Sequence, residues 1–436
     1  MIRELRILPP LAIARFGAAP TPMDNYDAVV DPERPLGHRQ LRPAPTLRID
    51  EVTGAIAETI MPAQLAFTQN GLVRPVAPFL EVWALTDNDR LEQLTTDLLA
   101  AENASVADVR WRVRLGNLKV FRRTGQDGDR VDADSGEIAD HDTHPLAGTA
   151  PNFWPGKSIP LGSVRFIRPT PEHPQIRLRF TPAAGFVYGA SATAPPVGPP
   201  ADPNVRDVVY DASRGRWLGY QDSDATSTAP GQIFAVDAQG RSRGYLDDGC
   251  DGLIQVAVGV GGNTLTSFGR IGVGPPAYAP DGLPIRSVAD ELEQALFGPD
   301  VDADDVTAEQ AEEIVRRAFE TVRLMNTAFM NVGGMAGHDA GQGRRREPIM
   351  ARSLVDSTAL EQLHQSVLVS LRSGAAAWFA DVLRDYDEVG DLTNRGRRKM
   401  PAMMRGADGQ HLALTRRQVA IIRALARGPV FPDGET

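Results

Sequence analysis

The sequence predicts an α+β protein, in which an irregular, β-rich N-terminal body is followed by a helical segment. Residues 1–285 are rich in proline and glycine and contain short runs in which apolar and polar residues alternate, a pattern typical of strands with one wet face. From residue 286 onward, apolar residues recur at helical spacing behind capping motifs. We therefore expect two domains, residues 1–285 and 286–436, with the helical segment packed on the body.

Five runs in the first domain are predicted strands. In VRWRVRLGNLKVF, residues 109–121, the apolar residues Val109, Trp111, Val113 and Leu115 alternate with arginine. This alternation indicates one buried and one solvated face. The other predicted strands are residues 163–167, 175–181, 232–236 and 253–260.

Two stretches of the same domain are predicted to be loops. Residues 192–203, ATAPPVGPPADP, hold too many prolines for a sheet interior. Residues 124–145 are polar and rich in turn-forming residues, so we expect a long exposed loop or hairpin arm.

Capping boxes and one short amphipathic run predict the helices of the second domain. In a capping box, a threonine and a glutamine or glutamate three residues later satisfy each other's backbone N–H groups. Gly428 and Pro429 are expected to end the last helix. The apolar stripes behind the boxes are predicted to be core and not a cofactor site. The boxes are Thr307–Gln310, Thr358–Glu361 and Thr415–Gln418, and the short run is 287–297.

Composition excludes several classes of function. The formal net charge of −10 argues against nucleic acid as the main partner, which would favour a basic face. No run approaches the roughly 20 apolar residues of a membrane span, and the first residues do not resemble a signal peptide. One cysteine excludes an internal disulfide framework, so a reducing cytoplasm is the expected location.

The single cysteine, Cys250, lies in the acidic segment DDGCDG at residues 247–252. Neighbouring carboxylates raise the pKa of a thiol, so a nucleophilic Cys250 is disfavoured. Asp247, Asp248 and Asp251 are possible metal ligands, although their spacing does not fit a calcium loop. We favour a turn ahead of the strand at 253–260, and keep the metal site as an alternative.

Histidines mark two further candidate sites. His141 and His144, three residues apart in a polar loop, are possible metal ligands. His338 and Asp339 lie in a glycine-rich loop, where the aspartate could orient the imidazole for acid–base catalysis. No dinucleotide-binding GxGxxG, P-loop, GxSxG or HExxH pattern occurs.

Five stretches, in the same order along the chain, resemble the cysteine-tryptophylquinone (CTQ) amino-acid oxidases, the group of lysine ε-oxidase and glycine oxidase. The resemblance implies the lysine ε-oxidase fold. In the third stretch, the position of Cys250 is usually occupied by a small residue in the family. The stretches are ILPPLAIARFG (7–17), VRWRVRLGNLKVF (109–121), YLDDGCDGLIQVAV (245–258), GVGPPAYAPDGLPIRSVADEL (272–292) and KMPAMMRGADGQHLALTRRQVAIIRALARG (399–428).

The resemblance also implies what this chain lacks. In the family, the quinone forms from a cysteine and a tryptophan beyond the last of these stretches, and this sequence ends at Thr436, about where that region would begin. Cys250 aligns with the aspartate turn and not with the quinone cysteine. We therefore expect no self-derived quinone, no other cofactor, and no catalytic residue that carries over from the family.

Three hypotheses of function follow, and they leave open whether the chain is an enzyme. The first is a quinone-less relative, an oxidoreductase or tailoring enzyme that acts on an amino acid or a peptide-borne amino group. In it, His338 and Asp339 would be catalytic, and Arg15, Arg344 and Arg345 would contact substrate. The second is a non-catalytic scaffold or subunit that pairs with a second chain or with a flavoprotein, the partner that the resemblance implies. The third is a metal-dependent enzyme that uses the histidine loop or the aspartate segment.

Overall fold

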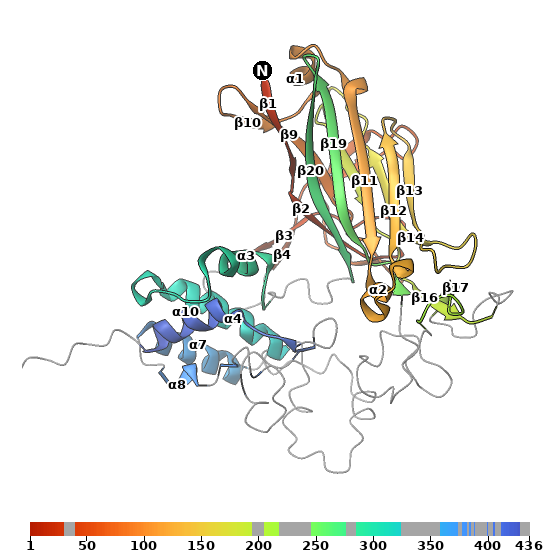
Figure 1. The fold of residues 1–436 in the computed structure, drawn as a ribbon. Coiled ribbons are helices and arrows are strands. Elements are labelled where there is room, and N and C mark those ends of the chain that lie inside the picture. The colour runs from red at the N-terminus through yellow and green to blue at the C-terminus, as the bar shows by residue number, and fades with distance from the viewer. Residues whose placement is uncertain are drawn as a thin grey trace, which may run out of the picture. The chain divides into compact units, whose positions relative to one another are not determined.

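The computed structural model describes residues 1–29, 40–193, 205–217, 246–275, 285–323, 358–373, 377–381, 383–384, 388, 399, 404–405 and 411–427. The chain divides into two compact units, residues 1–27 with 42–278, and residues 28–41 with 279–436. Among the described residues, the regular elements of the first unit are mainly strands and those of the second mainly helices (Figure 1). The fold class is therefore α+β, as the sequence predicts.

One layer of the first unit is a six-stranded antiparallel sheet in the order β1-β9-β15-β14-β13, with β10 paired to β9. In β9, Leu80, Val82 and Ala84 are fully buried, because alternate side chains of a strand face the same side. The strands are β1 (Ile2–Leu8), β9 (Phe79–Thr86), β10 (Leu91–Gln93), β13 (Thr143–Gly148), β14 (Ile159–Phe166) and β15 (Arg177–Thr181).

The other layer is a five-stranded sheet in the order β12-β11-β19-β20-β2, in which β2 runs parallel to β20 and the other neighbours are antiparallel. Trp111 and Val113 of β11 are fully buried, as are Ile254 and Val256 of β19. The strands are β2 (Leu11–Arg15), β11 (Val109–Asn117), β12 (Val131–Ile138), β19 (Asp251–Val260) and β20 (Asn263–Gly274).

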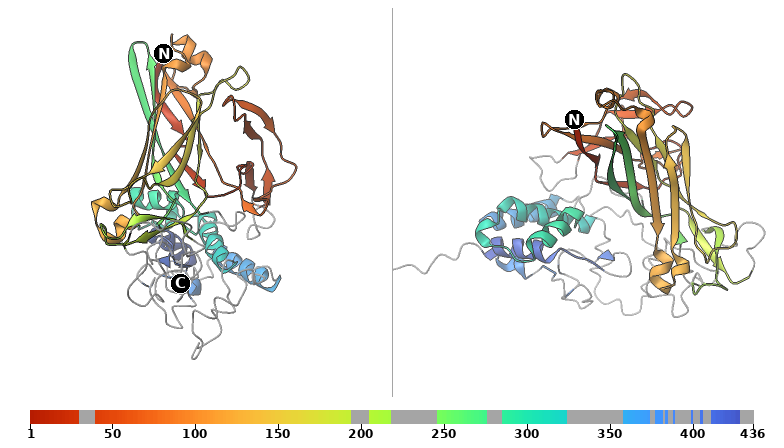
Figure 2. Two further views of the ribbon diagram at one scale, coloured as in Figure 1. Left: turned by 90° about the vertical axis from the view of Figure 1, so that its right-hand side faces the viewer. Right: turned by 45° about the horizontal axis from the view of Figure 1, so that its top comes forward.

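The two sheets share one hydrophobic core. The ring of Trp111 in one sheet lies 6.3 Å from the ring of Phe166 in the other, measured between centroids. The N-terminal segment joins the layers, because β1 pairs in the first sheet and β2, after Pro9 and Pro10, pairs in the second. Figure 2 gives two further views of these layers.

Smaller elements lie around the two layers. The hairpin of β5 and β6 lies against the six-stranded sheet, where the backbone N–H of Arg168 donates to the carbonyl oxygen of Gly54 at 2.9 Å. A three-stranded sheet has the order β17-β16-β18. These elements are β3 (Tyr26–Val29), β4 (Gln40–Pro43), β5 (Thr46–Ile49), β6 (Ile56–Ile60), β7 (Thr68–Gln69), β8 (Leu72–Val73), β16 (Val187–Ser191), β17 (Val205–Asp211), β18 (Leu246–Asp247), α1 (Thr96–Ala101), α2 (Lys119–Thr124) and the short 3₁₀ helices η1 (Val106–Asp108) and η2 (Asp127–Asp129).

The second unit has its own core, built from the predicted apolar stripes. Ala311, Ile314 and Val315 of α4 are buried in it with Leu371 of α7 and Ile422 of α10. The elements are α3 (Val288–Phe297), η3 (Ala303–Asp305), α4 (Ala308–Arg323), α7 (Thr358–Arg372), α8 (Ala377–Ala380), α10 (Arg416–Arg427), β21 (Met404–Arg405) and β22 (His411–Leu412).

Two predicted capping boxes are confirmed. The backbone N–H of Thr307 donates to Oε1 of Gln310 at 3.0 Å, and the Gln310 N–H donates back to the Thr307 hydroxyl at 3.3 Å. The same reciprocal pair joins Thr415 and Gln418, at 2.8 and 3.1 Å. The third differs, because α7 begins at Thr358 itself. The last helix ends at Arg427, before the predicted stop at Gly428.

The structure corrects two boundaries. The stretch 124–145, predicted to be a loop, contains all of β12 and the start of β13. Val131 and Ala133 are buried, whereas Asp132 and Asp134 are exposed. The alternation of a strand is therefore present, with acidic residues on its solvent-facing side. The strand predicted at 109–121 ends at Asn117, and α2 follows it. The predicted strand 232–236 and most of the proline-rich loop at 192–203 lie outside the described residues.

Candidate functional site

The acidic segment forms a turn between β18 and β19, and we call residues 246–251 the Asp turn. Asn117, the last residue of β11, holds it: Nδ2 donates to the carbonyl oxygens of Asp247 and Gly249, each at 2.7 Å. The N–H of Gly249 donates to Oδ1 of Asp247 at 2.9 Å, an aspartate-type turn. The prediction of a turn ahead of this strand is confirmed.

Asp247 forms an ion pair with Lys119 at the start of α2. Lys119 itself is positioned by Asn117, whose Oδ1 accepts the Lys119 backbone N–H at 3.0 Å. One of the three carboxylates in the segment is therefore neutralised by a cation from a distant part of the chain.

Asp248 differs from its neighbour because it is completely buried. Its Oδ2 accepts the backbone N–H groups of Gly185 and Phe186, both at 3.1 Å. Its Oδ1 has no hydrogen-bond partner among the described residues. Burial raises the pKa of Asp248 to about 7, although the two backbone hydrogen bonds act to lower it. The charge of Asp247 adds to the increase.

Tyr188 carries a second buried oxygen, on the strand that pairs with the start of the Asp turn. It lies in β16 opposite Leu246 of β18, and its hydroxyl also has no partner among the described residues. Burial raises the pKa of Tyr188, and the charge of Asp248 is the next largest cause. Two buried oxygens thus interact electrostatically without a hydrogen bond between them.

Phe16 packs against the Asp turn through two glycines. A Cβ atom on Gly249 would lie 3.3 Å from Cζ of Phe16, and a Cβ atom on Gly185 would lie 2.9 Å from Cβ of Phe16. Gly185 also has a φ of 91°, a conformation that other residues rarely adopt. Glycine at both positions therefore leaves room for the Phe16 ring.

Four of the five stretches that resemble the oxidases meet at this turn. Phe16 belongs to the first, Asn117 and Lys119 belong to the second, and the turn itself is part of the third. The fourth joins through β20, where the N–H of Val273 donates to the carbonyl oxygen of Cys250 at 2.8 Å. Segments that are far apart in sequence thus form one packed cluster.

Cys250 is buried, and its Sγ lies 3.4 Å from the carbonyl oxygen of Leu161. Burial is the largest cause that raises the pKa of the thiol, and the charges of Asp248 and Asp251 raise it further. A thiol in this environment is a poor nucleophile, as the sequence indicates.

The structure does not assemble the metal sites considered from the sequence. Asp247 is paired with Lys119, Asp248 binds backbone N–H groups, and Asp251 is exposed. Within the described ranges, no group of three or more His, Cys, Asp or Glu side chains could hold a metal ion.

His141 and His144 have separate partners. Nδ1 of His141 lies 3.0 Å from the carbonyl oxygen of Phe166, and its ring packs against the Phe166 ring at a tilt of 49°, with centroids 4.8 Å apart. Burial lowers the pKa of His141. Nε2 of His144 lies 2.7 Å from Oδ1 of Asp140. The two imidazoles therefore stabilise local structure instead of converging on one point.

Of the remaining predicted site residues, the structure describes Arg15. Arg15 exchanges backbone hydrogen bonds with Val76, at 3.1 and 3.0 Å, and its Nη1 donates to the carbonyl oxygen of Pro275 at 3.2 Å. These contacts fix the end of β2. The predicted catalytic and substrate-binding residues of the glycine-rich and basic loops, His338, Asp339, Arg344 and Arg345, lie outside the described residues.

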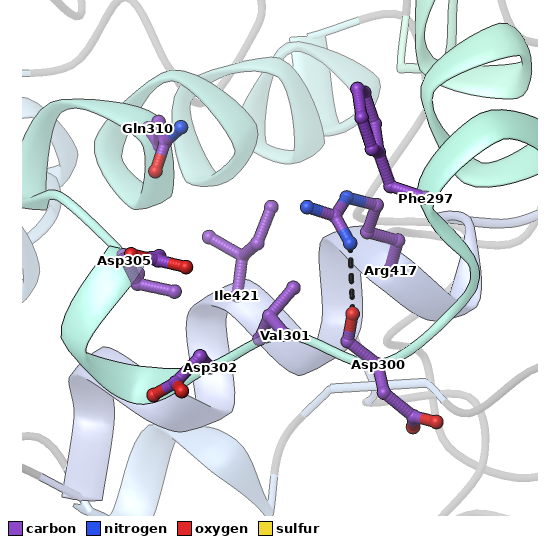
Figure 3. A pocket seen from close by; sticks show the side chains of 9 residues that line it. Phe297, Asp300, Val301, Asp302, Asp305, Gln310, Arg417 and Ile421 are labelled. Carbon is purple, nitrogen blue, oxygen red and sulfur yellow. Dashed lines mark hydrogen bonds between the residues drawn. The ribbon is translucent and has the colours of Figure 1, made fainter.

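The second unit contains a small polar pocket that the sequence did not indicate (Figure 3). Its volume is about 230 Å³, and Arg417 crosses it to donate to the carbonyl oxygen of Asp300 at 2.8 Å. Nε of Arg417 also lies 3.1 Å from Oε1 of Glu293. Asp302 accepts the N–H of Asp304 at 3.1 Å and so caps η3. These contacts tie the loop after α3 to α10.

Comparisons with known proteins give one fold likeness. The sequence matches no protein-family model and no curated protein. The structure is similar to the crystal structure of the L-Lys ε-oxidase from Marinomonas mediterranea, with a TM-score of 0.49 and 15% sequence identity. The likeness covers 97% of this chain and 61% of that enzyme, so the chain spans less than two thirds of its length. A likeness at this level does not establish a family.

The described part of the chain also contains no helix that is both long and apolar enough to cross a membrane.

Proposed function

We propose that the protein acts on the amino group of an amino acid or of a peptide-borne residue, and that Asp248 and Tyr188 receive this group as an ammonium ion. The observation that carries the proposal is the pair of buried oxygens, Oδ1 of Asp248 and the Tyr188 hydroxyl, that lack partners in the described structure. A buried polar atom without a partner costs roughly 1–3 kcal/mol. An ammonium group has three N–H donors, enough to supply a partner to each of these oxygens.

The charge of the site supports a cationic ligand. Lys119 is paired with Asp247, and the negative charge of Asp247 raises the pKa values of Asp248 and Cys250. A positive ligand would stabilise the ionised form of Asp248. With its pKa raised to about 7, this carboxyl group can also exchange a proton with an amine near neutral pH.

The sequence resemblance supports the choice of substrate class. It is to enzymes that oxidise amino groups, and one of the stretches that carry it forms the Asp turn while three others contact it. An oxidoreductase or tailoring reaction at an amino group is therefore the activity that we propose for this site. A flavoprotein that matures or accompanies the chain is the partner implied by the same resemblance.

We further propose that the described chain works without a quinone of its own. Cys250 is the single cysteine of the sequence, and it is buried against the Leu161 carbonyl with a raised thiol pKa. Intact mass should equal the mass of the unmodified chain. Loss of hydrogens through a crosslink, or a positive redox-cycling stain for quinone, would contradict this.

The test of the amino-group site is a binding titration on the full chain. Free amino acids and peptides with a free amino group are compared with their N-acetylated forms by calorimetry, and ammonia release is followed in parallel. We expect the free amines to bind and the acetylated forms to fail, because acetylation removes the positive charge. Failure of every free amine to bind at millimolar concentration overturns the proposal.

Variants locate the binding. Asp248→Asn and Tyr188→Phe should each weaken binding by roughly tenfold or more, which is about 1.4 kcal/mol. Asp251→Asn is the matched control, because Asp251 is exposed at the start of β19. Equal binding by wild type and a folded Asp248→Asn variant contradicts the assignment of this residue.

A second candidate function is a subunit that binds a flavoprotein, the partner implied by the sequence resemblance, through the exposed apolar face of α3. Val288, Leu292, Leu296 and Phe297 are 57%, 57%, 76% and 69% exposed, and the first three are four residues apart on one helix face. Native mass spectrometry with the flavoprotein, using wild type and a Leu292→Glu variant, tests this role. Absence of a complex with wild type, or an unchanged complex with the variant, contradicts it.

A further inference from the structure

Two arginines stand on the outer face of β15, at Arg177 and Arg179. Leu178 and Phe180 of this strand are fully buried in the core, so the alternating arginines point to the opposite side of the sheet. The guanidinium carbon of Arg179 lies 4.3 Å from the ring centroid of Phe79, its cross-strand neighbour in β9. The ring holds the flat cation in place.

The β5–β6 hairpin and the turn between its strands adjoin this face. Arg165, the cross-strand neighbour of Arg179 in β14, donates to the carbonyl oxygen of Glu51 at 2.9 Å and to its Oε2 at 3.1 Å. Arg168 donates to the carbonyl oxygen of Thr53 at 2.9 Å. These bonds hold the hairpin against the sheet and leave Arg179 half-buried.

Glu51, the carboxylate whose charge acts on Arg179, and Asp24, which binds Arg48, already have partners. Asp24 is paired with Arg48 and Arg74, and Glu51 is paired with Arg165. Within the described part of the chain, Arg179 has no ion pair and no hydrogen-bond acceptor. Burial lowers its pKa to about 10, the positive charge of Arg48 adds to the decrease, and Glu51 opposes it.

Arg177 offers a second unused donor on the same face. Its Nε donates to Oε1 of Glu81 at 2.6 Å, and the other oxygen of Glu81 accepts Nε2 of Gln93 at 2.8 Å. Nη1 of Arg177 is buried and has no acceptor among the described residues. Residues two apart in a strand project to the same side about 7 Å apart, so Arg177 and Arg179 face one region.

We propose that Arg179 and Arg177 form a binding site for an oxyanion, a carboxylate or phosphate group, on the outer face of β15. A half-buried guanidinium without a counter-ion is unfavourable, and an oxyanion supplies both the charge and the acceptors that it lacks. The planar fork of arginine matches the two oxygens of these groups. Phe79 and the hairpin restrict the motion of Arg179 before the ligand arrives, which reduces the entropic cost of binding.

The experiment uses the full chain and two probes, sodium phosphate and sodium acetate, each compared with sodium chloride at equal ionic strength. Calorimetry should show binding of at least one of the oxyanions, and the melting temperature should rise with its concentration. Binding of phosphate alone, of acetate alone or of both identifies the preferred group. Each of these results supports the site, provided that the variants below respond as expected. No response of wild type to either probe beyond that to chloride overturns the proposal.

Variants separate this site from general salt effects. Arg179→Met should weaken binding by at least roughly tenfold, and without oxyanion it should be at least as stable as wild type, because an unpaired buried cation is gone. Arg179→Lys keeps the charge but not the fork, so its response should be intermediate. Arg112→Met is the control, because Arg112 is exposed and paired with Asp134 on another sheet.

An unchanged oxyanion response in both Arg179 variants overturns the proposal. If Arg179→Met does not fold, the oxyanion response of Arg179→Lys decides. A weakened response supports the site, and an unchanged response overturns the proposal. Asp248→Asn should keep the full response, so the failure of the amino-group site and the failure of this site are distinguishable.

Discussion

Nδ2 of Asn117 lies 2.7 Å from the carbonyl oxygen of Gly249, which is 132 residues further along the chain. The same amide binds the carbonyl oxygen of Asp247, so one side chain satisfies two acceptors of the Asp turn. Asn117→Ala leaves both without this donor, and we expect the free energy of unfolding to fall by about 2–4 kcal/mol. Denaturant unfolding at neutral pH measures the loss.

The control for Asn117→Ala is Arg110→Ala, which removes an exposed ion pair with Glu137. That change should alter the free energy of unfolding by less than about 1 kcal/mol. Equal losses in the two variants would show that the Asn117 bonds contribute little.

The pH dependence of stability should report on Asp248. Because its pKa is raised from 3.8 to about 7, the folded chain binds more protons than the unfolded chain between these values, and stability falls as pH rises through this range. Ionised Asp248 should therefore make wild type less stable at about pH 8 than at about pH 6, by roughly 1.4 kcal/mol. The dependence levels off above the folded pKa.

Asp248→Asn removes this titration while keeping the shape of the side chain. The stability difference between variant and wild type, measured by parallel denaturant titrations, should change between the two pH values in favour of the variant. A difference that is the same at both pH values contradicts a raised Asp248 pKa.

Two glycines of β19 should respond differently to alanine. A Cβ atom on Gly252 would lie 2.0 Å from the carbonyl oxygen of Arg114 and 2.9 Å from Cα of Leu115, both backbone atoms of β11. We expect Gly252→Ala to lower the free energy of unfolding by about 3 kcal/mol, through overpacking that backbone cannot relieve. Thermal unfolding followed by circular dichroism measures it.

Gly259→Ala is the matched change in the same strand. Its nearest contact would be Cβ of Asp108 at 3.7 Å, an ordinary van der Waals distance. Stability should stay within about 1 kcal/mol of wild type or increase. A larger loss for Gly259→Ala than for Gly252→Ala is incompatible with the strand register described above.

Cys250 should be unreactive in the folded protein. Its thiol is buried and its pKa is raised, so very little thiolate is exposed to reagent at about pH 8. Mass spectrometry after iodoacetamide treatment should find the native chain unmodified and the denatured chain alkylated. Alkylation of the native chain within minutes would contradict this environment.

Local patterns predicted several elements well. Alternation identified β11 and β19, and the pairs Thr307–Gln310 and Thr415–Gln418 identified two helix starts, because these signals involve residues a few positions apart. Alternation did not reveal β12, because Asp132 and Asp134 follow the buried Val131 and Ala133 and acidic residues are typical of loops.

The interactions that define the candidate site could not be predicted, because they are non-local. The partners of Asp248 are backbone N–H groups at Gly185 and Phe186, more than 60 residues away. Arg179 has no ion pair in the described part of the chain, while Glu51, whose charge acts on it, is paired with Arg165. Neither leaves a pattern in the sequence.

The parallel pairing of β2 with β20 has a consequence for synthesis of the chain. β2 ends at Arg15, and the register brings it beside Gly274. Because the ribosome synthesises the chain from its N-terminus, β2 is made long before β20. The exposed edge of that strand must therefore be protected in the cell while some 250 further residues are made, by chaperones or by transient contacts within the growing chain.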